Sequence, residues 1–203
     1  MEHVQPDANL YTQMGLCFEQ LENCPDAESC YLEAIRLDPA HDEAYFRLGE
    51  CLFQRERWEG AKGAYESAFR LNKKANYLAA LGETHYQMGN YENAQLFFQD
   101  ACDMAPDECE QWIRLATFQM SIGDYELAVE TLDEAAMYSD CLLHINYCKI
   151  ACLYKNGRRQ EALIILEQTL GEHEGKEYQI LFDLAPDIQY ADAFMATIDA
   201  YFA

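Results

Sequence analysis

Small residues recur along the chain at a fixed distance of 33 or 34 positions. One series consists of alanines, a second follows it seven residues later, and a third precedes both. Internal repeats of about 20–50 residues indicate stacked structural units. This period therefore constrains the fold more strongly than the composition does. The three series are Ala27, Ala61, Ala94, Ala128 and Ala162; Ala34, Ala68, Ala101 and Ala135; and Gly15, Gly49, Gly82 and Ala116.

The third period shows how one repeat is built. Apolar and small residues lie three or four positions apart on both sides of the pair Gly89–Asn90, as expected for helices. Glycine and asparagine favour turns, so the period predicts two helices joined by a turn, and Pro106 ends the second helix. Antiparallel helices approach closely only where side chains are small. We therefore interpret the recurring small residues as packing positions and not as catalytic residues.

This pattern resembles the tetratricopeptide repeat, a helix–turn–helix unit of about 34 residues. The resemblance implies an all-α fold, a right-handed superhelical solenoid of about five such repeats with a C-terminal helical cap. The fifth repeat is degenerate, because Thr169 replaces its second alanine. The matching residues of the first repeat are Tyr11, Met14, Gly15, Phe18, Ala27, Tyr31, Ala34 and Pro39. The predicted repeats lie near residues 8–41, 42–74, 75–108, 109–142 and 143–170.

The repeat pattern stops at Gly171, so we divide the chain into a repeat array, residues 1–170, and a C-terminal segment, residues 171–203. A short helix is expected around residues 178–184 and a final helix near residues 190–202. A solenoid needs its terminal apolar face covered, so we interpret this segment as a cap. The alternative is that it is an exposed surface that docks a partner helix. The apolar face of the final helix consists of Phe194, Ile198, Tyr201 and Phe202.

The charge of the chain excludes several kinds of partner. Thirty-six acidic residues oppose fourteen basic ones, for a formal charge of −22. Such a chain repels phosphate backbones and anionic lipids, so we expect no nucleic acid and no membrane as partners. The first residues lack secretory features, and the nine cysteines lack paired CxxC spacing. Reduced thiols without a signal peptide favour a cytoplasmic location.

No catalytic motif stands out in the sequence. The GxSxG elbow, the HExxH motif and a phosphate-binding glycine loop are all missing, so we predict neither an enzyme nor a cofactor. Cys148 and Cys152 are four residues apart, on one face of a helix, and His144 lies one turn away. Zinc would need a fourth ligand, so we interpret these cysteines as small core residues. A thiol or metal protein that uses them remains an alternative.

The first helices of stacked pairs line the concave side of such a solenoid. Their predicted exposed stripe combines aromatic and aliphatic side chains with glutamates, and residues 75–148 carry thirteen acids against one base, Arg114. We therefore predict a groove that binds a protein or peptide with basic and apolar residues. The alternative is that curvature of the array buries the aromatics and the glutamates are only solvated. The predicted groove residues are Glu43, Phe46, Glu50, Phe53, Asn76, Glu83, Tyr86, Gln87, Glu110, Ile113 and Met120.

These observations favour a non-catalytic adaptor or scaffold that holds a partner segment. A second hypothesis is a secretion or assembly chaperone that masks an apolar segment of a client. The sequence predicts no particular oligomeric state.

Overall fold

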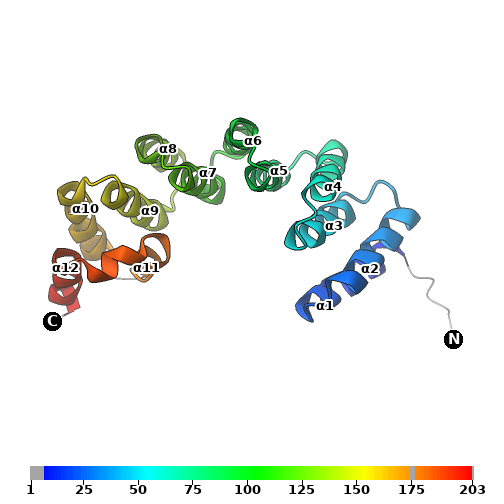
Figure 1. The fold of residues 1–203 in the computed structure, drawn as a ribbon, viewed down its shortest axis with the longest axis horizontal. Coiled ribbons are helices and arrows are strands. Elements are labelled where there is room, and N and C mark those ends of the chain that lie inside the picture. The colour runs from blue at the N-terminus through cyan, green and yellow to red at the C-terminus, as the bar shows by residue number, and fades with distance from the viewer. Residues whose placement is uncertain (1–6, 174–176, 203) are drawn as a thin grey trace. The chain divides into compact units, whose positions relative to one another are not determined.

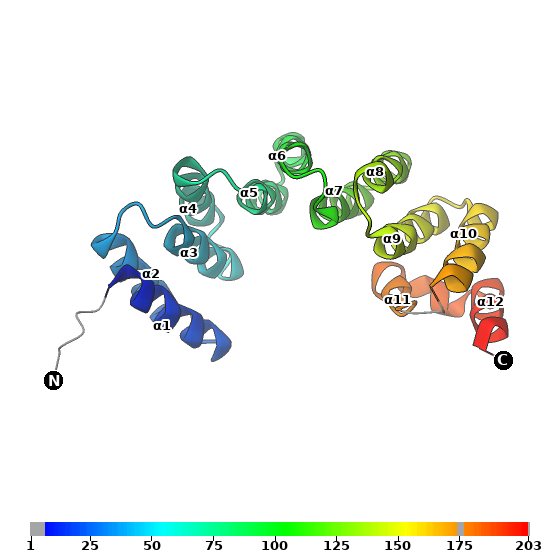
Figure 2. The ribbon, with the colours of Figure 1, turned by 180° about the vertical axis from the view of Figure 1, so that it is seen from behind.

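The computed structural model describes residues 7–173 and 177–202, and within them it contains helices and no strand (Figures 1 and 2). The predicted all-α class is confirmed. The chain divides into two compact units, Met1–Met104 and Ala105–Ala203. The first unit holds α1 (Ala8–Gln20), α2 (Cys24–Leu37), α3 (Asp42–Gln54), α4 (Trp58–Leu71), α5 (Ala75–Gln87) and α6 (Tyr91–Met104). The second holds α7 (Cys109–Ser121), α8 (Tyr125–Tyr138), α9 (Leu142–Lys155), α10 (Arg159–Glu172), α11 (Ile180–Leu184), the 3₁₀ helix η1 (Pro186–Tyr190) and α12 (Asp192–Phe202).

Consecutive helices pair into hairpins, α1 with α2 and so on to α9 with α10. In the first three hairpins the cause is a glycine on the first helix, which lets a large side chain of the second helix approach its backbone. A β-carbon added to Gly15 would lie 2.4 Å from Cε1 of Tyr31, and one added to Gly82 would lie 3.0 Å from Cγ of Phe98. At the equivalent places of the fourth hairpin, Ala116 and the smaller Leu132 are both fully buried. The recurring residues are therefore packing positions.

Each hairpin turns at the same place in the repeat, through one residue in the left-handed region of backbone conformation. The amide of the next residue then donates to a carbonyl in the last turn of the first helix, as from Asn90 N to His85 O at 2.8 Å. This left-handed residue with its closing hydrogen bond is a common way to end a helix. The left-handed residues are Glu22, Glu56, Gly89, Gly123 and Gly157, with φ between 56° and 86°.

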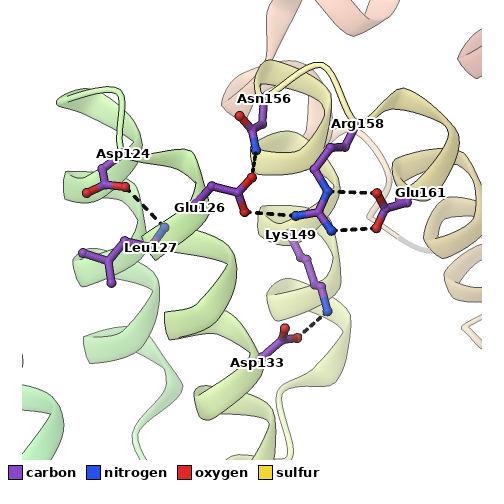
Figure 3. A network of polar contacts seen from close by, with 8 residues as sticks. All are labelled: Asp124, Glu126, Leu127, Asp133, Lys149, Asn156, Arg158 and Glu161. Atoms are coloured by element: carbon purple, nitrogen blue, oxygen red, sulfur yellow. Dashed lines mark hydrogen bonds and ion pairs between the residues drawn. The ribbon is translucent and has the colours of Figure 1, made fainter.

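Neighbouring hairpins within a unit are joined by carboxylates on second helices. In the first unit Glu28 accepts hydrogen bonds from Arg55 and Arg57. In the second unit Glu126 accepts from Nδ2 of Asn156 at 2.7 Å and from Nη1 of Arg158 at 3.1 Å (Figure 3). Arg57 and Arg158 each directly precede the second helix of their own hairpin. The same turn position thus provides the inter-hairpin contact in both units.

The C-terminal segment packs on the last hairpin of the second unit. α11 lies on α9 and α12 lies on α10. Phe194 and Ile198 of α12 are buried, and the ring of Phe194 meets Tyr154 edge-on at a centroid distance of 5.2 Å. Tyr201 and Phe202 remain 41% and 55% exposed. We retain the capping role of this segment as a proposal.

The helices of this segment are shorter than the sequence pattern predicts. Pro186 opens η1, and the extended backbone of Ala191 (φ −92°, ψ 101°) separates η1 from α12. The final helix therefore begins at Asp192 and not at residue 190.

Candidate functional site

Within the first unit, α1, α3 and α5 lie along one side and α2, α4 and α6 along the other (Figure 1). We call the side formed by α1, α3 and α5 the inner face. The predicted groove residues of this unit belong to two of these helices, α3 and α5. Of these eight side chains, Asn76 and Gln87 are exposed and the others are partly exposed. On α3 they are Glu43, Phe46, Glu50 and Phe53, and on α5 they are Asn76, Glu83, Tyr86 and Gln87.

The aromatic rings of the inner face rest on other rings. Phe46 stacks on Tyr77 of α5 at a centroid distance of 4.8 Å and also contacts Tyr65 of α4 at 5.5 Å. Offset and tilted ring pairs at these distances are favourable. Phe46 thereby joins three helices while part of its ring stays exposed. Two further pairs have the same character: Phe53 with Trp58 at 4.9 Å, and Tyr86 with Tyr91 at 5.8 Å.

The carboxylates on α3 have a cationic partner. Arg47 lies between Glu43 and Glu50 on one face of the helix, with Nη1 2.9 Å from Oε2 of Glu50 and Nη2 3.6 Å from Oε1 of Glu43. Burial disfavours the charged form of Arg47, but Glu50, Glu43 and Glu19 outweigh it and raise its pKa. Ion pairs at i,i+3 and i,i+4 are a known helical pattern, so this spacing could have revealed Arg47 in the sequence.

A second polar cluster, which sequence reasoning missed, joins α3 to α5. Oδ2 of Asp42 accepts hydrogen bonds from Oη of Tyr77 at 2.7 Å, from Nζ of Lys74 at 2.9 Å and from Nδ2 of Asn72 at 3.1 Å. Burial opposes ionisation of Asp42, yet the donors from Lys74, Tyr77 and Asn72 prevail and lower its pKa. The cluster fixes the start of α5 against the start of α3, beside the stacked ring of Phe46.

The remaining predicted groove residues lie on α7 of the second unit. Glu110 is exposed and pairs with Arg114, at 2.6 Å from Oε1 to Nη2. Ile113 is partly exposed. Met120, which the pattern assigned to the exposed stripe, is buried, with 8% of its surface accessible.

Cys148 and Cys152 lie in the core of the second unit, on α9, with 3% and 0% of their surfaces exposed. Burial raises the pKa of each thiol to about 12. Both thiols are therefore protonated at neutral pH. His144 instead faces Glu177, with Nε2 3.5 Å from Oε2. In residues 7–173 and 177–202, no three His, Cys, Asp or Glu side chains come together as a metal site would require.

Within the same described ranges, none of the helices combines the length and the apolar character needed to cross a bilayer.

Comparison with known proteins places the sequence among repeat proteins. Models of the tetratricopeptide repeat match residues 13–76 and 75–108. Superkiller protein 3 of Schizosaccharomyces pombe is 25% identical over 169 residues, which cover 63% of this chain and 12% of that protein. Anaphase-promoting complex subunit 3 of the same organism is 26% identical over 176 residues, which cover 83% of this chain and 26% of that protein. The chain thus spans about a quarter or less of the length of these relatives.

Among solved structures, the chain is similar to YrrB, described as a tetratricopeptide repeat protein with an unusual peptide-binding site. The TM-score is 0.59 at 17% identity, and the match covers 86% of this chain and 90% of YrrB. At this identity the likeness concerns the fold.

Proposed function

Because the chain belongs to the tetratricopeptide repeat family, we propose that it is a non-catalytic protein-interaction module, an adaptor or scaffold in the cytoplasm. In this proposal the inner face of the first unit binds a peptide or helix of a partner protein. The observation that carries the proposal is the set of partly exposed aromatic rings on this face, bordered by carboxylates. The rings are Phe46, Phe53 and Tyr86.

The rings are suited to binding because they are already held in position. Each of the three packs against at least one other ring, at centroid distances of 4.8 to 5.8 Å. A partner side chain that covers such a ring pays little entropy for ordering it. Aromatic anchors with one accessible side are also the residues that dominate binding energy in protein interfaces.

The charges indicate where a basic partner residue would bind. Arg47 already pairs with Glu43 and Glu50 on α3. On α5, Glu83 accepts a hydrogen bond from the neutral amide of Gln87 at 3.1 Å. A lysine or arginine of the partner is therefore expected opposite Glu83, one turn from the ring of Tyr86. Such a pair sets the orientation of the bound segment more than its affinity.

The proposal is tested by selecting peptides from a random library on the intact chain and measuring their affinity for variants. We expect the selected peptides to combine apolar residues with lysine or arginine. Glu83→Lys is expected to weaken their binding at least tenfold. The matched control is Glu66→Lys, at an exposed position of α4 on the other side of the unit.

Equal affinity of the peptides for wild type and for Glu83→Lys would overturn the proposal. So would an equal loss in both variants, because that loss would reflect total charge and not the inner face.

A further inference from the structure

α1 carries an apolar stripe that nothing in the described chain covers. Leu10, Met14, Cys17 and Leu21 follow one another at steps of four, three and four residues, so they share one face of the helix. Leu10 and Met14 are 43% and 40% exposed, Leu21 is 73% exposed, and Cys17 is exposed as well. We call this surface the α1 edge.

The repeat itself shows what covers these positions in the following hairpins. The places of Leu10, Met14 and Cys17 correspond to Ala44, Leu48 and Cys51 in α3, and to Tyr77, Leu81 and Thr84 in α5. All six of these residues are buried, with at most 8% of their surface exposed.

Both helices of the preceding hairpin pack on the next first helix. Sγ of Cys51 donates to Oε1 of Glu19 on α1 at 3.3 Å, and the ring of Tyr77 stacks on Phe46 of α3. α2 lies on α3, and α4 lies on α5. An amphipathic helix is therefore a surface that fits the α1 edge.

The charge around the α1 edge indicates the charge that a helix bound there would carry. Residues 7–35 contain six acidic residues and neither lysine nor arginine, and two of the six, Glu28 and Glu33, pair with arginines outside this range. Exposed carboxylates stand at both ends of the stripe: Asp7 caps the start of α1, and Glu22 lies in the turn after it. A basic helix is attracted to such a surface, while a second copy of this chain, with a formal charge of −22, is repelled.

We propose that the α1 edge is a second docking surface, separate from the inner face, for an amphipathic helix of a partner protein with lysine or arginine beside its apolar stripe. The apolar side chains of that helix cover Leu10 and Met14, and its basic residues approach Asp7 and Glu22. The α1 edge shares no residue with the proposed groove, whose residues in this unit lie on α3 and α5.

The probe is a stapled helical peptide with the sequence of residues 57–72, which contains α4, in which Glu59 and Glu66 are replaced by lysine. This helix packs on α5 in the native chain. A matched acidic peptide keeps both glutamates and replaces Lys62 and Arg70 by glutamate. Binding to the intact chain is followed by the methyl NMR signals of Leu10, Met14 and Leu21.

The basic peptide is expected to shift these three signals, and the acidic peptide to bind at least tenfold more weakly. Met14→Glu and Leu21→Glu, both at exposed positions, are each expected to weaken binding of the basic peptide at least tenfold. The melting temperature of the protein is expected to stay unchanged in both variants. Glu83→Lys on the inner face is expected to leave this binding unchanged, which separates the result from the test of the inner face.

Three outcomes would overturn the proposal. The first is that the α1 signals do not move when the basic peptide is added, and the second is that the two peptides bind equally well. The third is a dimer of the chain, seen by sedimentation, that Met14→Glu dissociates, because the occupant would then be a second copy.

Discussion

The ring of Tyr65 on α4 lies directly over the α-carbon of Gly49 on α3, so that a β-carbon built on Gly49 would lie 2.5 Å from Cε1 of the ring. No ordinary contact is that short, and one of the two helices must therefore shift when the glycine is replaced. Tyr65 in turn contacts Phe46 at 5.5 Å. The packing of the hairpin and the aromatic rings of the inner face are thus mechanically connected.

Gly49→Ala is expected to lower the free energy of unfolding by about 1–3 kcal/mol, the usual cost of overpacking a core. The control is Gly63→Ala on α4, where an added β-carbon meets nothing within 4 Å. It is expected to raise stability by about 0.5–1 kcal/mol, because alanine is the better helix former. Urea denaturation of both variants checks the pair, and equal effects would contradict the role of Tyr65.

Glu56→Gly is expected to stabilise the protein by roughly 1 kcal/mol. Glu56 adopts φ 57° at the turn between α3 and α4, a conformation that costs about 1–2 kcal/mol for residues with a β-carbon. Glycine adopts it without strain, and the equivalent turns at Gly89 and Gly123 already use it. The melting temperature measures the effect.

The matched control is Glu66→Gly in the middle of α4, which is expected to destabilise by about 1 kcal/mol. A lower melting temperature for Glu56→Gly would show that the side chain, and not the backbone, matters at the turn.

Asp42→Asn is expected to remove part of the acid sensitivity of folding. The pKa of Asp42 is lowered in the folded protein, so its contribution is fully present above the unfolded pKa of about 3.9. It is lost as the pH falls through the lower folded pKa. Wild type should therefore lose more stability than the variant as the pH is taken from about 5 to 3. If the free energy of unfolding changed with pH in the same way in wild type and in Asp42→Asn, the contribution of the Asp42 hydrogen bonds to stability would be contradicted.

The cysteines are expected to differ in their reaction with iodoacetamide at neutral pH. Cys17 is exposed, whereas Cys148 and Cys152 are buried with thiol pKa values raised to about 12. Cys17 should be alkylated in the folded protein, and the other two only when denaturant is present. Peptide mass spectrometry after brief labelling reads this out, and early labelling of Cys148 would contradict its place in the core.

The ion pairs of Figure 3 are expected to contribute little and to depend on salt. Glu126 and Arg158 have side chains that are 64% and 37% exposed, and exposed pairs are screened. Glu126→Gln should lower the melting temperature slightly at low salt and not at 1 M NaCl. A large drop that persists at high salt would mean that Glu126 has a packing role.

The sequence predicts the hairpins well because their contacts recur. Ala27 and Ala61 are both fully buried, as their shared period requires. The turns are predicted only where glycine marks them. Glu22 and Glu56 take the same left-handed conformation as Gly89, and no propensity rule assigns that conformation to glutamate. The position in the repeat is the signal that would have identified them.

The inner face is predicted less completely. Helical periodicity shows which side of its helix a residue lies on, but it does not show which residue of another helix it contacts. The pattern places Phe46 on the face but cannot show that it rests on Tyr77, a residue of the next hairpin. Met120 falls on the same stripe and is buried. The charge count over residues 75–148 does not include α3, so it carries no information on the pairing of Arg47 with Glu43 and Glu50.

The turns at Gly89, Gly123 and Gly157 leave open space, since a β-carbon there would meet nothing within 4 Å. The surroundings of the three turns differ. Gly89 lies between Tyr86 and Tyr91, whose rings are 5.8 Å apart, and Gly157 lies between Asn156 and Arg158, which bond to Glu126. Gly123 belongs to neither proposed surface, so a fluorophore attached at the turn of the fourth hairpin would report on a bound partner without competing for its place.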